Sequence, residues 1–234
     1  MRRASAVAAA FLALLAAPSA GAHTQPGVGP SVLPKVFVAY ARVAHVSVYG
    51  SESSSRVRQT LANPTGDGAL LSFLVRSLHR GRALVYLPTR PNGSTGWVPR
   101  SQVRIFGDPY RVRIDLRRHS LTVRRGGAIV VGAPVGVGRA VTPTPAGTYY
   151  IVSRIRPLDP GSVYGVFAFG LSAHSNVFTR FGFSGDGRIG LHGTNVPSGV
   201  GHDVSHGCIR MTNRTILRLA RILPLGTPVT ITHR

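Results

Sequence analysis

The stretch YRVRIDLRRHSLTVRRGGAIVVGAPV, residues 110–135, alternates apolar and polar side chains and is broken by a glycine turn. Val112, Ile114 and Leu116 fall on one side of its first half, which is the period of a half-buried β-strand. The Arg-Arg-Gly-Gly turn then separates two apolar runs and predicts a hairpin. This pattern favours a fold that is mainly β.

The rest of the chain has the same character. Gly and Pro number 28 and 17 among 234 residues, and long helical periodicity is scarce, which favours short strands and many turns. The strongest helix signal is NRTILRLARIL, residues 213–223, where apolar side chains recur at i, i+3, i+4 and i+7. Asn213 is the predicted N-cap of this helix.

The N-terminus reads as a secretory signal over residues 1–22. Arg2 and Arg3 precede an apolar stretch, and small residues at 20–22 form a cleavage pattern. The apolar stretch is shorter than the roughly 20 residues of a membrane span, although an uncleaved anchor is the alternative. We therefore predict an exported protein, in a periplasmic-type space or the cell wall, with a Pro- and Gly-rich linker over 23–35.

Residues 36–106 contain short β-type runs between turn clusters, which is typical of a small barrel. Within them YLPTRPNGSTGWVPRSQV, residues 86–103, resembles the last part of bacterial SH3-like domains. Trp97 is predicted to be a core aromatic of that barrel, with stacking on a ligand as the alternative. The Gly-Asp-Pro turn at 107–109 marks the boundary with a second β-rich domain over 109–232.

The charge balance is strongly basic. The formal net charge is +21, Lys35 is the single lysine, and only seven residues are acidic. So few carboxylates argue against glycosidase-type chemistry, which needs a pair of them. For an exported protein, anionic cell-wall polymers are more plausible partners than nucleic acid, and a merely solvated surface is the alternative.

The reactive side chains concentrate in HGTNVPSGVGHDVSHGCIR, residues 192–210, which holds Cys208, the single cysteine. Glycines oppose the helix that a His202 and His206 metal pair would need, and CxxC and HExxH patterns are absent from the sequence, so we predict no metal site. A cysteine nucleophile with a histidine base fits better. Spacing leaves three candidate bases: His192, His202 and His206.

The longer string HGTNVPSGVGHDVSHGCIRMTN closely resembles the signature of the YkuD-type L,D-transpeptidases. That signature is a His-Gly, a variable spacer and then Ser-His-Gly-Cys-x-Arg. The segments TPTPAGTYYI (142–151) and LPLGTPVTI (223–231) resemble two further parts of the family. The resemblance covers about residues 109–232 and implies a β-sandwich-like catalytic domain with one short helix after the motif.

The resemblance implies roles for individual residues. Cys208 is the expected nucleophile and His192 the expected base, oriented by the carbonyl of Gly193. His206 and Gly207 are expected to shape the site, with nearby backbone amides forming the oxyanion hole.

Arg210 either binds a substrate carboxylate or braces the loop. His202 and Asp203 lie in the variable spacer and receive no role.

The implied reaction is acyl transfer between peptidoglycan stem peptides through a thioester. A donor tetrapeptide and an amine acceptor would be joined by a crosslink between third-position residues. Carbapenem-type β-lactams are the implied inhibitors, and the resemblance implies that no metal or organic cofactor takes part. The alternatives are a hydrolytic L,D-carboxypeptidase and a wall-binding module without catalysis.

Overall fold

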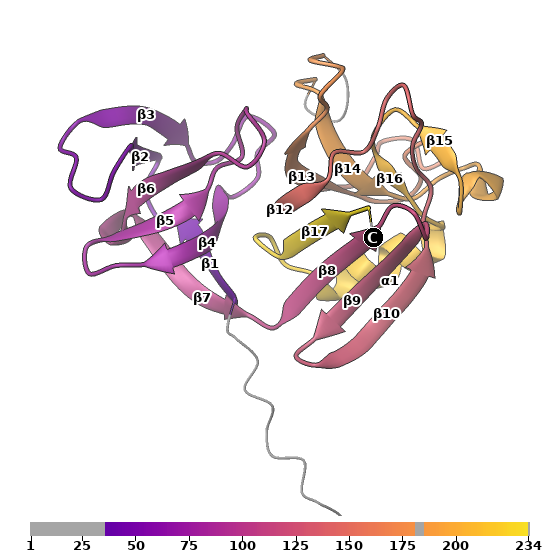
Figure 1. Cartoon of the computed structure of the whole chain (residues 1–234), viewed down its shortest axis with the longest axis horizontal. Helices are drawn as coiled ribbons and strands as arrows, with labels where there is room; N and C mark the ends of the chain where they lie inside the picture. Colours follow the sequence, from indigo (N-terminus) through magenta and orange to yellow (C-terminus); the bar gives the residue numbers. More distant parts are fainter. Residues whose placement is uncertain (1–35, 181–184, 234) are drawn as a thin grey trace, which may run out of the picture. The chain divides into compact units, whose positions relative to one another are not determined.

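The computed structural model describes residues 36–180 and 185–233, which belong to one compact unit, Val32–Arg234 (Figure 1). The predicted signal peptide and linker, residues 1–22 and 23–35, lie outside the described residues. No helix in the described part of the chain is both long and apolar enough to cross a membrane.

The first half of the described chain forms a seven-stranded sheet in the order β3-β2-β6-β5-β4-β1-β7. Its elements are β1 (Val36–Ala41), β2 (His45–Tyr49), β3 (Val57–Ala62), β4 (Ser72–Leu78), β5 (Arg82–Tyr86), β6 (Thr95–Pro99), the 3₁₀ turn η1 (Arg100–Gln102) and β7 (Val103–Asp108). All its pairs are antiparallel. Phe73, Val85 and Val98 lie in its own apolar core. The short strands expected over 36–106 are therefore present, while the SH3-like assignment stays a prediction.

Trp97 does not lie in that core. It is half-buried, and its ring packs edge-on against His79 with 4.7 Å between centroids. The reason is the strand alternation of β6, which turns Gly96 and Val98 inward and Trp97 to the other face. The prediction of a core aromatic is wrong at this position.

The second half forms an eight-stranded sheet in the order β10-β9-β8-β17-β12-β13-β14-β16. Its strands are β8 (Tyr110–Asp115), β9 (Ser120–Arg125), β10 (Ala128–Pro134), β12 (Gly147–Ile155), β13 (Ala168–His174), β14 (Arg188–His192), β16 (Ile209–Arg210) and β17 (Pro228–Thr232). A two-stranded pair, β11 (Val137–Gly138) with β15 (Asp203–Ser205), and the 3₁₀ turn η2 (Pro197–Gly199) complete it. The prediction of a mainly β fold is confirmed.

The stretch 110–135 forms the strands that its pattern predicts. Across β8 and β9, Val112 lies opposite Val123 and Ile114 lies opposite Leu121. All four are at most 2% exposed and belong to the core that also holds residues of β14 and β16. The polar residues of the same strands consequently point to the opposite face of the sheet.

The predicted helix is present as α1 (Asn213–Ile222) and follows the cysteine motif directly. Ile216 and Leu219 are buried in the core, as the periodicity indicated, and α1 lies behind β8 and β9 in Figure 1. The N-cap is Thr212 rather than Asn213, because the Thr212 hydroxyl accepts the Thr215 amide at 3.2 Å. The Asn213 side chain accepts the Val166 amide instead.

Candidate active site

Two short parallel strands bring the distant parts of the motif together. β14 pairs with β16 so that Leu191 lies opposite Ile209 and His192 opposite Arg210. Cys208 comes immediately before β16, and its Sγ accepts the Gly190 amide at 3.4 Å. His192 and Cys208, sixteen positions apart in the sequence, therefore lie on neighbouring strands, with Cys208 at the level of Gly190.

The hydrogen bonding of His192 fixes its tautomer. Its Nδ1 lies 2.6 Å from the carbonyl oxygen of Gly193. A carbonyl can only accept, so Nδ1 carries the proton and Nε2 presents a lone pair. The ring is 1% exposed and packs edge-on against Tyr164 at 5.1 Å. His192 is thus oriented as a base by a backbone group, with no carboxylate needed.

Burial keeps both reactive groups uncharged. It lowers the pKa of His192 to about 4, opposed by the hydrogen bond to Gly193 and reinforced by the positive charge of Arg210. It raises the pKa of the Cys208 thiol, opposed by the Gly190 amide and again by Arg210. At neutral pH the resting pair is therefore a thiol and a neutral imidazole rather than an ion pair.

A hydroxyl network holds the turn before Cys208. The Ser205 hydroxyl donates to the Cys208 carbonyl at 2.6 Å and accepts the Gly207 amide at 3.0 Å. The Thr144 hydroxyl donates to the Gly207 carbonyl at 2.8 Å. Gly207 has φ +118°, which only glycine adopts readily. Gly207 thus shapes the turn, and its amide is engaged by Ser205.

Arg210 brings positive charge into the site. Its backbone pairs with Gly136 in both directions at 2.8 Å, while its charge acts on His192, Cys208 and Tyr164. Its buried Nε has no hydrogen-bond partner within the described residues. The backbone of Arg210 therefore braces the fold, and its guanidinium faces the reactive groups.

His206 and His202 are placed differently from His192. Both are exposed, and Nε2 of His206 accepts a hydrogen bond from the Arg139 guanidinium at 2.8 Å. The His206 ring also lies 6.0 Å from that of Phe178. His206 consequently lies at the rim of the site, and of the three candidate bases only His192 is buried and oriented. Asp203 pairs with His119 at 2.7 Å.

Some residues near the site carry no sequence signal. Tyr164 comes from a segment without periodicity, and burial, followed by the nearby Cys208, raises the pKa of its hydroxyl. Arg90, from the loop between β5 and β6, donates to the carbonyls of Ser175 and Phe178 at 2.9 and 3.0 Å. Asn92, in the same loop, bonds the backbone of His174 in both directions. A loop of the first sheet thus holds the segment in which Phe178 lies close to His206.

Within residues 36–180 and 185–233, no group of three or more His, Cys, Asp or Glu side chains is arranged to hold a metal ion.

Comparisons with known proteins identify the family of the second half of the chain. Residues 109–231 match the family model of the L,D-transpeptidase catalytic domain, YkuD. YkuD of Bacillus subtilis (strain 168), named as a candidate L,D-transpeptidase, is 36% identical over 123 residues, which are 53% of this chain and 66% of that protein. YkuD of Bacillus licheniformis is 40% identical over 124 residues, with the same two shares. The chain thus spans slightly less than two thirds of these relatives.

Among solved structures, that of the L,D-transpeptidase LdtMt1 in complex with imipenem is similar at a TM-score of 0.44 and 17% identity. The similarity covers 64% of this chain and 90% of that one.

Proposed function

The chain belongs to the family of L,D-transpeptidase catalytic domains, and from this premise we propose that it crosslinks peptidoglycan stem peptides with Cys208 as its nucleophile. The observation that carries the proposal is a buried thiol, Cys208, and an oriented imidazole, His192, on two strands that pair directly with each other. Such a pair activates a cysteine for acyl transfer. The substrate class follows from the family.

Acylation would begin with attack by Cys208 Sγ on the carbonyl carbon of the L-centre of the third stem residue. The thiol proton passes to Nε2 of His192 as the C–S bond forms. The bond to the terminal D-Ala then breaks, and His192 returns the proton to the leaving amine. A thioester and free D-Ala result, and no proton is left over.

Because Cys208 and His192 are both neutral at rest, the thiol does not lose its proton before a substrate binds. A buried imidazolium–thiolate pair would carry a large desolvation cost, and the pKa shifts of both groups oppose it. Proton transfer is therefore favoured only when a substrate carbonyl is in place and charge moves on to its oxygen. The Arg210 guanidinium and the backbone amide of Cys208 are the proposed stabilisers of that oxyanion.

Deacylation would complete the transfer. The side-chain amine of a second stem attacks the thioester, His192 takes one of its protons, and the proton returns to the departing thiolate. An amide crosslink between two third-position residues forms and Cys208 is regenerated. If water replaces the amine, the same site is an L,D-carboxypeptidase, which is the second candidate function.

The proposal also gives roles to four residues around the reactive pair. Gly193 orients the base, Gly207 shapes the turn, His206 borders the site and Arg210 meets the substrate's carboxylate or oxyanion. Carbapenem-type β-lactams would acylate Cys208, because their strained amide presents the same kind of carbonyl.

We also propose that residues 36–106 form an SH3-like domain and that residues 1–22 are a signal peptide for export. Anionic cell-wall polymers are further partners.

Incubation with a disaccharide-tetrapeptide tests the proposal, with products identified by mass spectrometry. Crosslinked dimer plus released D-Ala from the unaltered protein, and neither from Cys208→Ala, is the expected result. Tripeptide alone would assign hydrolysis instead. Absence of both products, with stem peptides still bound, would leave a wall-binding module.

A further inference from the structure

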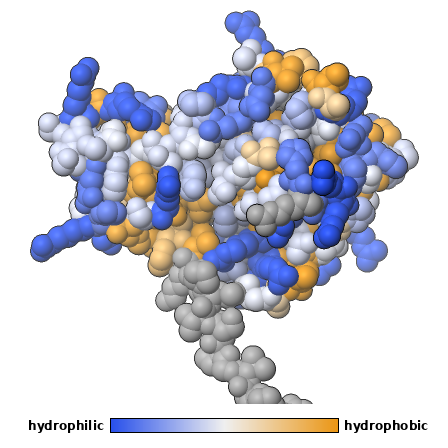
Figure 2. Space-filling model, viewed as in Figure 1, coloured by the Kyte–Doolittle hydropathy of each residue, from blue (hydrophilic) through white to orange (hydrophobic). Residues whose placement is uncertain are grey.

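Several arginines lie on the outer face of the eight-stranded sheet. They come from residues 111–124, far from the cysteine motif in the sequence. Alternation along β8 and β9 directs their apolar side chains into the core and their polar side chains outward. Arg111 and Arg113 project from β8, and Arg124 projects from β9. Because α1 lies behind these strands in Figure 1, that view looks onto this outer face, and Figure 2 shows hydrophilic side chains spread over much of it.

This face is hollowed rather than flat. A hollow of about 560 Å³ lies over β8, β9 and β17, and Arg111, Arg113, Arg118 and Arg124 line it. A second hollow, of about 570 Å³, adjoins it and shares Arg111 and Thr230. We call the two together the arginine trough, defined by Arg76, Arg111, Arg113, Arg118 and Arg124.

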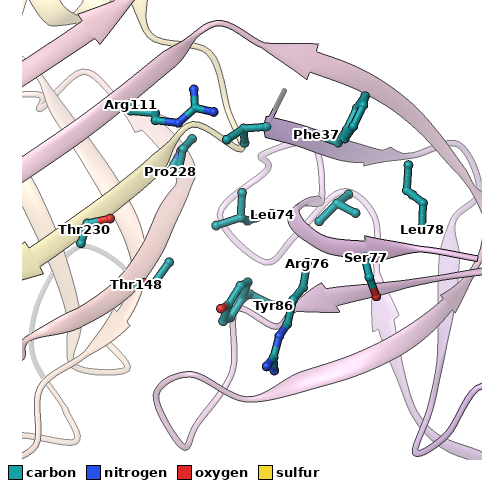
Figure 3. Close-up of a pocket in the computed structure, with 12 residues that line it drawn as sticks. Phe37, Leu74, Arg76, Ser77, Leu78, Tyr86, Arg111, Thr148, Pro228 and Thr230 are labelled. Atoms are coloured by element: carbon teal, nitrogen blue, oxygen red, sulfur yellow. The ribbon is translucent and has the colours of Figure 1, made fainter. Parts of the chain in front are cut away.

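The second hollow reaches the first sheet. In Figure 3, Arg111, Thr230 and Thr148 lie on one side of it, and Leu74 and Tyr86 lie on the other. The Arg76 side chain extends along the margin opposite Arg111. Arginines therefore line both adjoining hollows, so that a ligand lying across the two could contact more cations than a ligand in either one.

Acidic side chains compensate only part of the charge in the trough. Arg111 and Arg124 lie directly opposite each other in the strand register, and like charges in that position are destabilising. Asp108 lies close enough to Arg111 for their charges to interact, and Asp115 pairs with Arg118 at 4.0 Å. The Arg113 guanidinium forms no hydrogen bond or ion pair within the described chain. An anion placed here would relieve the repulsion between Arg111 and Arg124 and would satisfy the donors of Arg113.

From these observations we infer that the arginine trough binds a flexible polyphosphodiester strand of the kind found in anionic wall polymers. This inference goes beyond the acyl-transfer proposal and uses none of its residues. Guanidinium groups bind phosphate oxygens bidentately, which suits arginine better than lysine. Arg111 and Arg113 are about 7 Å apart along their strand and the next strand lies about 4.8 Å away, so successive phosphates meet successive cations.

Hydroxyl groups on the floor of the trough support a strand rather than a membrane. Ser120, Thr122, Thr230 and Thr232 line the hollow over β8, β9 and β17 with hydroxyl groups, whereas most residues that line the second hollow are apolar. These hydroxyls can bond the oxygens of a polymer that enters the hollow, whereas a flat lipid surface would meet only the rim. A lipid surface is therefore an outcome for the test to separate.

The test measures binding of a fluorescent glycerol phosphate oligomer by anisotropy at several salt concentrations. The trough variant is R111Q/R113Q/R124Q. The matched control R56Q/R80Q/R104Q removes the same charge from exposed positions in the strands and turns of the first half of the described chain. We expect the trough variant to weaken binding at least about tenfold at low salt, and to reduce the slope of log K against log salt by about 2. The control should change the dissociation constant less than about threefold, since those arginines line neither hollow.

The single variant R113Q keeps the test informative if the triple variant misfolds. The Arg113 guanidinium forms no hydrogen bond or ion pair within the described residues, so its replacement should not affect folding. It should lower the salt slope by about 0.7. Equal weakening by the trough variant and the control would overturn the inference in favour of diffuse charge. So would binding to phosphatidylglycerol vesicles that depends on the three arginines while the oligomer does not bind.

Discussion

The site around Cys208 and the arginine trough place polar groups under opposite conditions. At the site, burial lowers the pKa of His192, raises that of Cys208 and keeps both neutral. In the trough, guanidinium groups stay charged at the surface, and those of Arg111 and Arg124 lie opposite each other on β8 and β9. The site should respond to pH and little to salt, because its groups are withdrawn from screening. The trough should respond to salt and little to pH.

The largest expected effect is on the rate of acylation when His192, the proposed base, is replaced. His192→Gln should slow acylation of Cys208 by a carbapenem about 10³-fold, because the thiol loses its proton acceptor. His206→Gln is the matched control and should slow it less than about tenfold, since His206 lies at the rim and bonds Arg139. Stopped-flow or mass-spectrometric rates measure both. Equal losses would contradict the assignment of the base.

A second prediction concerns stability against pH. His192 has a pKa of about 4 in the folded protein and about 6.5 when unfolded. Between these values the unfolded chain binds the additional proton, so the free energy of unfolding falls as pH decreases through this window. The loss is about 3 kcal/mol in full.

Urea denaturation at several pH values between 7 and 4 measures this loss, and it should be missing from His192→Gln. Acylation should likewise persist to about pH 5 and decline as pH falls through about 4. A variant with the same pH dependence of stability as the unaltered protein would show that His192 is not buried in its neutral form.

The hydroxyl network gives an effect of intermediate size. Ser205→Ala removes the donor to the Cys208 carbonyl and the acceptor of the Gly207 amide, leaving both groups buried without partners. Stability should fall by about 2 kcal/mol. Ser54→Ala, at a half-buried serine whose hydroxyl bonds the backbone of Arg56, should cost less than about 0.5 kcal/mol. Equal effects in denaturation curves would argue against a structural role for Ser205.

The smallest effect is expected where the first sheet meets the catalytic half. Arg90→Gln removes hydrogen bonds to the carbonyls of Ser175 and Phe178. The exposed setting of Arg90 limits the stability loss to about 1 kcal/mol. Hydrogen exchange should be faster at residues 174–178, and Arg80→Gln should leave it unchanged. Unaltered exchange in Arg90→Gln would show that the first sheet does not hold this segment.

The sequence predicts what depends on local periodicity. The alternation over 110–135 predicts β8, β9 and β10, and the 3.6-residue period predicts α1. Both predictions succeed because a strand or helix that buries one face repeats apolar residues at a fixed spacing within a short stretch of sequence. The N-cap was misplaced by one position because Thr212 and Asn213 are both good capping residues, and only the tertiary contact of Asn213 with Val166 separates them.

The site depends on contacts that spacing does not encode. His206 is close to Cys208 in sequence, yet the pairing of β14 with β16 brings His192 to the site instead; family resemblance, and not spacing, anticipated this. Tyr164, Arg90 and Asn92 reach the site or its border through long-range packing. The trough likewise emerges only when β8, β9 and β17 are paired, because its arginines look scattered along the chain.

Intact-mass measurement with a carbapenem tests the central claim most directly. The protein at neutral pH should gain a single covalent adduct, and Cys208→Ala, with folding verified by thermal denaturation, should gain none. Persistence of the adduct in folded Cys208→Ala, or its absence from the unaltered protein, would contradict the claim that Cys208 is the nucleophile.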